Sequence, residues 1–174
     1  MGIEIERKFL VVGDGWRRDA HKVVAMAQGY LNDLDAVESG AQRASVRVRI
    51  EGEEARLNLK SREAGHTRQE FDYPLPVADA RALLGLCVGG LVDKRRHYVR
   101  HAGHLWEVDE FLGDNAGLVV AEIELEAADE AFDKPAWLGK QVTDSLRYYN
   151  LALAARPYSQ WSEQERQASD IAQD

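Results

Sequence analysis

Apolar and polar residues alternate at every second position in several segments of the chain. This period is typical of β-strands that bury one face, because successive side chains of a strand point to opposite sides of the sheet. It predicts strands over residues 3–8, 46–51, 57–60, 70–73, 94–100, 107–109 and 122–126. Gly52 and Gly103 lie where hairpin turns are expected, so neighbouring strands are predicted to pair antiparallel.

Two further segments have helical spacing instead. Residues 76–88 and 143–155 each carry an apolar stripe with this spacing, and Thr143 is the expected N-cap of the second helix. Many strands with few helices predict an α+β domain that is mainly β. A sheet with so many strands is expected either to pack as a sandwich or to close on itself and so remove its edges.

The chain of 174 residues is long enough for one domain with a real core. No linker divides residues 1–155, which we expect to form that single domain. Residues 156–174 are polar and charged, and their only large apolar residues are Trp161 and Ile171. They are predicted to be a tail or a loosely docked helix that is dispensable for chemistry.

Composition excludes several classes of function. The net charge of −8 argues against a broad nucleic-acid-binding surface, which needs an exposed basic face, but it is compatible with a local basic pocket. The single cysteine, Cys87, excludes an internal disulfide. No segment has the length and apolar character of a secretory signal or a membrane span, so we expect a cytoplasmic protein without nucleic-acid or membrane partners.

Charged residues two positions apart share one face of each predicted strand, and their sign differs from strand to strand. The sets on one face are Glu4, Glu6 and Lys8; Arg47 and Arg49; Asn58 and Lys60; Glu70 and Asp72; Lys94 and Arg96; Glu107 and Asp109; and Glu122, Glu124 and Glu126. The simplest interpretation is that these are solvent faces of an ordinary antiparallel sheet. However, such faces usually mix in neutral polar residues, whereas these are nearly all ionic.

Like charges two positions apart repel unless opposite charge lies over them. Neighbouring strands can supply it, and so can a ligand. A ligand that satisfies both basic and acidic pairs must be an anion that carries a cation, and a polyphosphate with a divalent metal fits this description. Arginine binds phosphate oxygens bidentately, lysine supplies compact charge, and Mg²⁺ or Mn²⁺ prefers carboxylate and phosphate oxygens.

The N-terminal sequence Glu4-Ile5-Glu6-Arg7-Lys8 resembles the E-x-E-x-K signature of the CYTH superfamily, the triphosphate tunnel metalloenzymes. The match continues through QGYL (28–31), VRVR (46–49), LNLK (57–60), RQE (68–70), KRRHY (94–98), WEVD (106–109), AEIE (121–124), VTD (142–144) and RYYN (147–150). Their order and spacing resemble the short, single-domain bacterial members over about residues 1–155. The resemblance implies a closed, eight-stranded antiparallel β-barrel with a charged tunnel and a few flanking helices.

The resemblance also implies roles for individual residues. Glu4, Glu6, Glu122 and Glu124 would hold the metal; Lys8, Arg47, Arg49, Lys60, Lys94 and Arg96 would bind the phosphate chain; and Glu70, Asp72, Glu107 and Asp109 would complete the tunnel. Glu4, Glu6 and Lys94 are the expected catalytic residues, with Lys94 a candidate general base. Relatives often have glutamate at the position of Asp72, so the carboxylate reaches less far here.

Metal-dependent hydrolysis of inorganic triphosphate to diphosphate and phosphate is the first functional hypothesis, because a chain this short has little extra structure to grip an organic group. Thiamine triphosphate or nucleoside triphosphate hydrolysis and an adenylate cyclase activity are alternatives. A non-catalytic polyphosphate-binding module is an alternative of a different class, but such a module would not need four carboxylates facing a metal. The sequence leaves the oligomeric state open, with a homodimer among the options.

Overall fold

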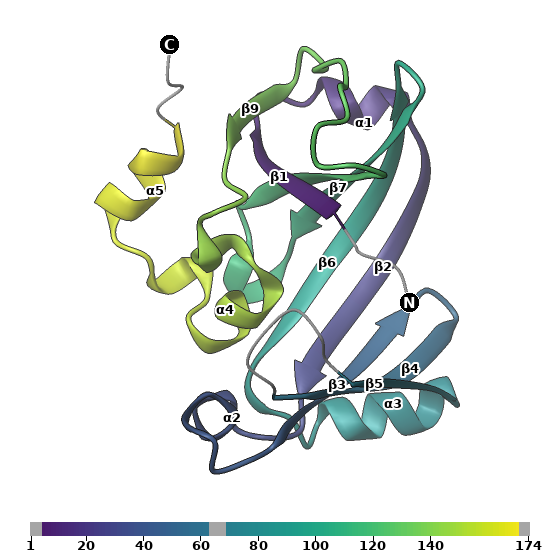
Figure 1. The fold of residues 1–174 in the computed structure, drawn as a ribbon, viewed down its shortest axis with the longest axis vertical. Helices are drawn as coiled ribbons and strands as arrows, with labels where there is room; N and C mark the ends of the chain where they lie inside the picture. Colours follow the sequence, from purple (N-terminus) through teal and green to yellow (C-terminus); the bar gives the residue numbers. More distant parts are fainter. Residues whose placement is uncertain (1–4, 63–68, 171–174) are drawn as a thin grey trace.

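The computed structural model describes residues 5–62 and 69–170. They form a nine-stranded, fully antiparallel sheet with the strand order β5-β4-β3-β2-β6-β7-β8-β1-β9 (Figure 1). The strands are β1 (Ile5–Val11), β2 (Ala20–Tyr30), β3 (Ala44–Glu51), β4 (Glu54–Ser61), β5 (Glu70–Leu75), β6 (Val88–His101), β7 (His104–Phe111), β8 (Val119–Leu125) and β9 (Leu138–Gln141). Every predicted strand is found within one of these, apart from residues 3 and 4, which lie outside the described residues, and Glu126, which follows the end of β8.

The two longest strands, β2 and β6, pair with each other and run through the middle of the sheet (Figure 1). The strands β3, β4 and β5 extend the sheet beyond β2, and the strands β7, β8, β1 and β9 extend it beyond β6. Strand β2 was not predicted, because its sequence AHKVVAMAQGY lacks strict alternation. The short strand β9 was missed as well.

The helices are α1 (Gly15–Asp19), α2 (Leu34–Ser39), α3 (Val77–Leu84), α4 (Asn150–Ala155) and α5 (Glu163–Asp170), with short 3-10 turns at Gly113–Asn115, Leu146–Tyr148 and Tyr158–Gln160. Helix α3 confirms the first predicted helix and covers β3 and β4, where Val48, Ala55 and Ala80 form a small core. The second prediction is wrong in its first half, since α4 begins only at Asn150. Thr143 does not cap it: the Thr143 Oγ1 accepts a hydrogen bond from the Lys8 backbone N–H at 3.1 Å.

The mainly β class of the fold is confirmed, but the hydrogen-bonded ladder differs from a closed eight-stranded barrel. It has nine strands, and within the described residues β5 and β9 are its two edges. Strand β9 has only four residues, and Pro74 in β5 has no N–H to donate to a partner strand. The sheet nevertheless curves, because residues of β1 and β8 line the same cavity as residues of β3, β4 and β5.

The C-terminal residues close one end of the curved sheet. Trp161 is only 4% exposed and belongs to a core cluster with Leu10, Val120 and Leu153. Its ring makes edge-on contact with that of Tyr148 at a centroid distance of 5.2 Å. Residues up to Trp161 are therefore packed into the domain. No helix among residues 5–62 and 69–170 is long and apolar enough to cross a membrane.

Candidate active site

A cavity of about 480 Å³ lies on the charged face of the sheet, between its two halves. Eight of the predicted site residues line it: Glu6, Lys8, Arg47, Arg49, Lys60, Glu70, Arg96 and Glu122. They come from β1, β3, β4, β5, β6 and β8. The period-two alternation of these strands thus directs their ionic side chains to one space, as the sequence predicted for the set.

A second cavity of about 570 Å³ adjoins the first, and Glu6 and Glu122 line both. Its other carboxylates are Glu107, Glu124 and Glu126, and the described residues of its lining include no lysine or arginine. The combined site is therefore polarised, with a basic half along β3 and β4 and an acidic half along β1, β7 and β8.

Lys94 and Asp109 are buried beside the site and line neither cavity. Asp109 accepts hydrogen bonds from the Lys94 Nζ at 2.6 Å and from the Arg96 Nε at 2.7 Å. Burial opposes the charge of Asp109, but the attraction of Lys94 and Arg96 outweighs it and lowers the pKa of Asp109 to about 2. Lys94 is fully buried and shares Asp109 with Arg96, so burial and the repulsion of Arg96 lower the pKa of Lys94.

Lys8 connects the two halves of the site. Its Nζ lies 2.8 Å from Glu6 Oε1 and 2.5 Å from Glu122 Oε1, and 4.5 Å from the centre of the Tyr149 ring. Burial lowers the pKa of Lys8, but the two carboxylates outweigh this and raise it overall. Burial raises the pKa of Glu107, an effect that its ion pair with Arg96 reduces.

The arginines of β3 are in a different state. Neither Arg47 nor Arg49 forms an ion pair with any of the described residues. Burial, together with repulsion by Arg47 and Arg96, lowers the pKa of Arg49. Lys60 has only a long contact, 3.8 Å, with Glu70. Among the described residues, the two arginines of β3 therefore carry positive charge without a carboxylate in direct contact, and a bound anion would stabilise it.

The remaining predicted residues are placed differently. Asp72 pairs with Arg56 at 2.5 Å and lines neither cavity. Glu124 lines only the acidic cavity. Glu4 lies outside the described residues, so its expected role has no geometry to support it.

Several residues of the site were not predicted. Tyr30, Ser45, Tyr149, Asn150 and Leu151 line the basic cavity without having been assigned to it. Tyr149, Asn150 and Leu151 lie at the start of α4. They reach the cavity because the C-terminal segment folds back towards the sheet, and the periodicity of the sequence does not predict this. Asn58, which the pattern put on the face of Lys60 without a role, donates to Glu70 Oε1 at 2.7 Å.

The donor chemistry of the acidic cavity suits a hard divalent cation, since all five of its titratable side chains are carboxylates. The described residues contain no group of three or more candidate ligands drawn together at metal-binding distance. A hard divalent cation usually takes only some of its ligands from protein carboxylates and fills the remaining positions with water and phosphate oxygens. Glu6 and Glu122 border the basic half and would hold such an ion next to a bound phosphate.

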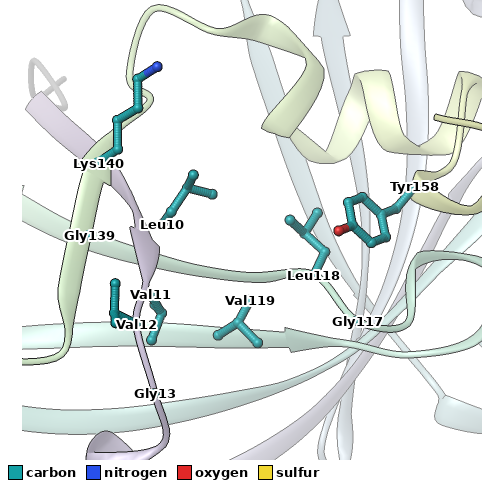
Figure 2. A pocket seen from close by; sticks show the side chains of 10 residues that line it. All are labelled: Leu10, Val11, Val12, Gly13, Gly117, Leu118, Val119, Gly139, Lys140 and Tyr158. Atoms are coloured by element: carbon teal, nitrogen blue, oxygen red, sulfur yellow. The ribbon is translucent and has the colours of Figure 1, made fainter. Parts of the chain in front are cut away.

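Another cavity, of about 400 Å³, lies between the ends of β1, β8 and β9 and the turn at Tyr158 (Figure 2). Its lining consists of aliphatic residues, glycines, Tyr158 and Lys140, and includes none of the predicted site residues. Its described lining has one cationic side chain and no carboxylate, which is not the chemistry of a metal–polyphosphate site.

Comparison with known proteins agrees with this geometry. The family model of the CYTH domain matches residues 2–158. An inorganic triphosphatase of Acetivibrio thermocellus is 42% identical over 165 residues, which cover 94% of this chain and all of the relative. An inorganic triphosphatase of Nitrosomonas europaea is 38% identical over 157 residues, covering 87% of this chain and 96% of the relative.

Solved structures agree as well. A crystal structure of an inorganic triphosphatase superposes with a TM-score of 0.71 at 34% identity, covering 88% of this chain and 95% of that one. A structure from Hippeastrum, described as a putative adenylyl cyclase with dominant triphosphatase activity, has a TM-score of 0.50 at 16% identity and covers 72% of this chain and 80% of that one. At that identity the second likeness concerns the fold alone.

Proposed function

The chain belongs to the CYTH domain family, and from this membership we propose that it is a divalent-metal-dependent hydrolase of linear triphosphates. The substrate is inorganic triphosphate, and the products are diphosphate and phosphate. Two relatives that match nearly the whole chain at 42% and 38% identity are inorganic triphosphatases, which supports this choice.

The observation that carries the proposal is the polarity of the site. Arg47 and Arg49 lack carboxylate partners among the described residues, and they face the same cavity as Lys60. In the adjoining cavity the charge is reversed, and Glu6 and Glu122 lie at the border between the two. A triphosphate that carries a divalent cation neutralises both halves at once, whereas a free anion or a free cation would neutralise only one.

Catalysis in such a site consists mainly of positioning and charge stabilisation. Arg47, Arg49 and Lys60 bind and straighten the phosphate chain. The cation would be held by Glu6 and Glu122, with Glu124 and Glu107 further along the acidic cavity. When bound, it would neutralise negative charge on the phosphate that is attacked. Lys8 and Arg96 lie between the halves and stabilise the negative charge that develops on the leaving oxygen.

The catalytic assignment of Glu4, Glu6 and Lys94 remains a prediction. A lowered pKa is the property that a lysine needs to accept a proton near neutral pH. However, the Lys94 Nζ is held by Asp109 and reaches neither cavity. We therefore propose Glu6 or Glu122 as the group that orients the attacking water, and Lys94 as a fixed buried charge that positions Asp109 and Arg96.

Hydrolysis of thiamine or nucleoside triphosphates and cyclisation of ATP are the competing activities. They need a pocket for a ring, and the described lining of the basic cavity offers Tyr30, Tyr149 and Leu151 at most. The identity of the metal, a cytoplasmic location, the oligomeric state and the dispensability of residues 156–174 for chemistry remain predictions.

The test is a substrate and metal panel. The purified protein is incubated with inorganic triphosphate, ATP and thiamine triphosphate, each with Mg²⁺, Mn²⁺ or EDTA, and phosphate, diphosphate and cyclic AMP are measured. We expect metal-dependent phosphate release that is fastest from inorganic triphosphate. Cyclic AMP and diphosphate from ATP would move the protein to the cyclase activity, and no turnover with any metal would favour the binding module.

A further inference from the structure

A buried glutamine of β2 holds one of the unpaired arginines. Gln28 is 1% exposed and lies directly opposite Arg49 in the β2–β3 ladder. The Gln28 Oε1 accepts two hydrogen bonds, from the Arg49 Nε at 3.1 Å and from the Arg49 Nη2 at 3.0 Å. Because a guanidinium has only donors, the amide oxygen must face it, and the two contacts fix both the position and the plane of the guanidinium.

The neutrality of this partner sets Arg49 apart. Lys8, Lys94 and Arg96 are all held by carboxylates within the described residues. A carboxylate orients a cation but also cancels its charge, whereas an amide oxygen orients it and leaves the charge in place. Arg49 forms no ion pair with a described carboxylate, and the attraction of Glu51 does not outweigh burial and the repulsion of Arg47 and Arg96, so the pKa of Arg49 remains lowered.

A second observation concerns the other end of the amide. The Gln28 Nε2 is buried and has no hydrogen-bond partner among the described residues. A buried donor without a partner destabilises the fold, so an apolar residue of similar size would be the more stable choice if packing were the only requirement. The amide is thus better explained by what its oxygen does for Arg49 than by its contribution to the core.

We propose that Gln28 is a positioning residue for the triphosphate: its neutral amide aims the Arg49 guanidinium at the cavity without cancelling the charge that binds phosphate. The identity of the anion as triphosphate rests on the proposed function, whereas the role of Gln28 in holding Arg49 does not. Glutamine and glutamate have nearly the same shape. The proposal therefore predicts that the charge of the residue at position 28 decides how strongly the anion binds.

The isosteric variant Gln28→Glu tests this directly. The carboxylate would keep the two contacts with Arg49 and turn them into an ion pair, so the thermal midpoint should equal or exceed that of the wild type. Binding of inorganic triphosphate in EDTA, measured by calorimetry, should weaken by about tenfold to a hundredfold, the loss of one charge-assisted contact. The KM for triphosphate should rise by a similar factor, more than kcat falls, and the binding should become less sensitive to salt.

Two further variants control for charge and for packing. Gln42→Glu adds the same charge at an exposed position and should leave binding unchanged. Gln28→Met removes the acceptor but leaves Arg49 charged, so binding should weaken while its salt sensitivity stays that of the wild type. If Gln28→Glu fails to fold, Gln28→Met decides: a folded variant with weakened binding supports the proposal, and one with wild-type binding overturns it.

The outcomes separate this inference from the function it builds on. A wild-type protein that binds triphosphate but does not hydrolyse it would refute the proposed function, and weaker binding by Gln28→Glu would still support the role of Gln28. Wild-type affinity and KM in a folded Gln28→Glu variant would overturn the inference, whatever the wild type hydrolyses.

Discussion

The buried ion pair of Lys94 and Asp109 gives a prediction about stability that can be worked out from the structure. In the variant Asp109→Asn, the fully buried Lys94 would lose its carboxylate, and Arg96 would lose its bidentate partner. Removal of one partner from a buried pair typically costs about 3–5 kcal/mol, because it leaves an uncompensated charge in the interior. The expected loss is therefore a large part of the stability of a domain of this size.

The pKa of Asp109 gives an independent magnitude. The folded protein holds it at about 2, below its usual value of 3.8. A group whose pKa is lower in the folded state stabilises the protein above the unfolded pKa and loses that contribution as the pH falls through the folded one. Asp109 should therefore contribute about 2–3 kcal/mol at neutral pH, and that contribution should disappear between about pH 4 and pH 2.

The assay is urea unfolding at a series of pH values, on the wild type and on Asp109→Asn. The difference between the two should be about 2–5 kcal/mol at pH 7 and should shrink below pH 4. It should also shrink at alkaline pH, because the pKa of Lys94 is lowered and this lysine then loses its proton. The double variant Lys94→Met/Asp109→Asn should be more stable at pH 7 than Asp109→Asn alone. A difference that stayed constant over the whole pH range, or a double variant no better than the single one, would refute the account of this pair.

Two other positions give predictions about packing. Trp161→Ala should lower the free energy of unfolding by about 3–5 kcal/mol, since this ring is buried among Tyr148 and Tyr158; a loss below about 1 kcal/mol would mean that the segment is not part of the core. Gly139→Ala would place a Cβ 2.9 Å from the Leu10 carbonyl oxygen and should cost about 1–3 kcal/mol, measured by the same unfolding assay. Gly15→Ala, where a Cβ meets nothing within 4 Å, is the matched control, and equal effects of the two would contradict the close contact.

The period-two pattern predicted most of the sheet and one face of the site. Arg47 and Arg49 share a face because they are two residues apart in one strand, and no knowledge of other strands is needed to see this. The same reasoning placed Glu122 and Glu124 together on β8, although only Glu122 reaches both cavities. Local periodicity therefore identifies the face of a side chain, but not its depth along the site.

What the pattern could not predict depends on pairing between distant strands. The burial of Gln28 follows from its register opposite Arg49, and β2 itself has apolar residues on both faces, such as Val23 and Val24, so its sequence shows no clear period. The burial of Lys94 beside the cavity depends on the ion pair that its side chain forms with Asp109 of the neighbouring strand β7. The packing of Trp161 into the core could not be predicted either, because a single large ring in a polar segment shows no periodicity.

The central claim, that a polarised cavity cleaves a metal-bound triphosphate, is tested most directly by phosphate release from inorganic triphosphate with Mg²⁺ and with EDTA. The measurement compares the wild type with Arg49→Ala, and with Arg18→Ala as a control at an exposed position outside the site. We expect release by the wild type and Arg18→Ala that requires the metal, and almost none by a folded Arg49→Ala. Equal release by all three proteins, or release that persists in EDTA, would contradict the account.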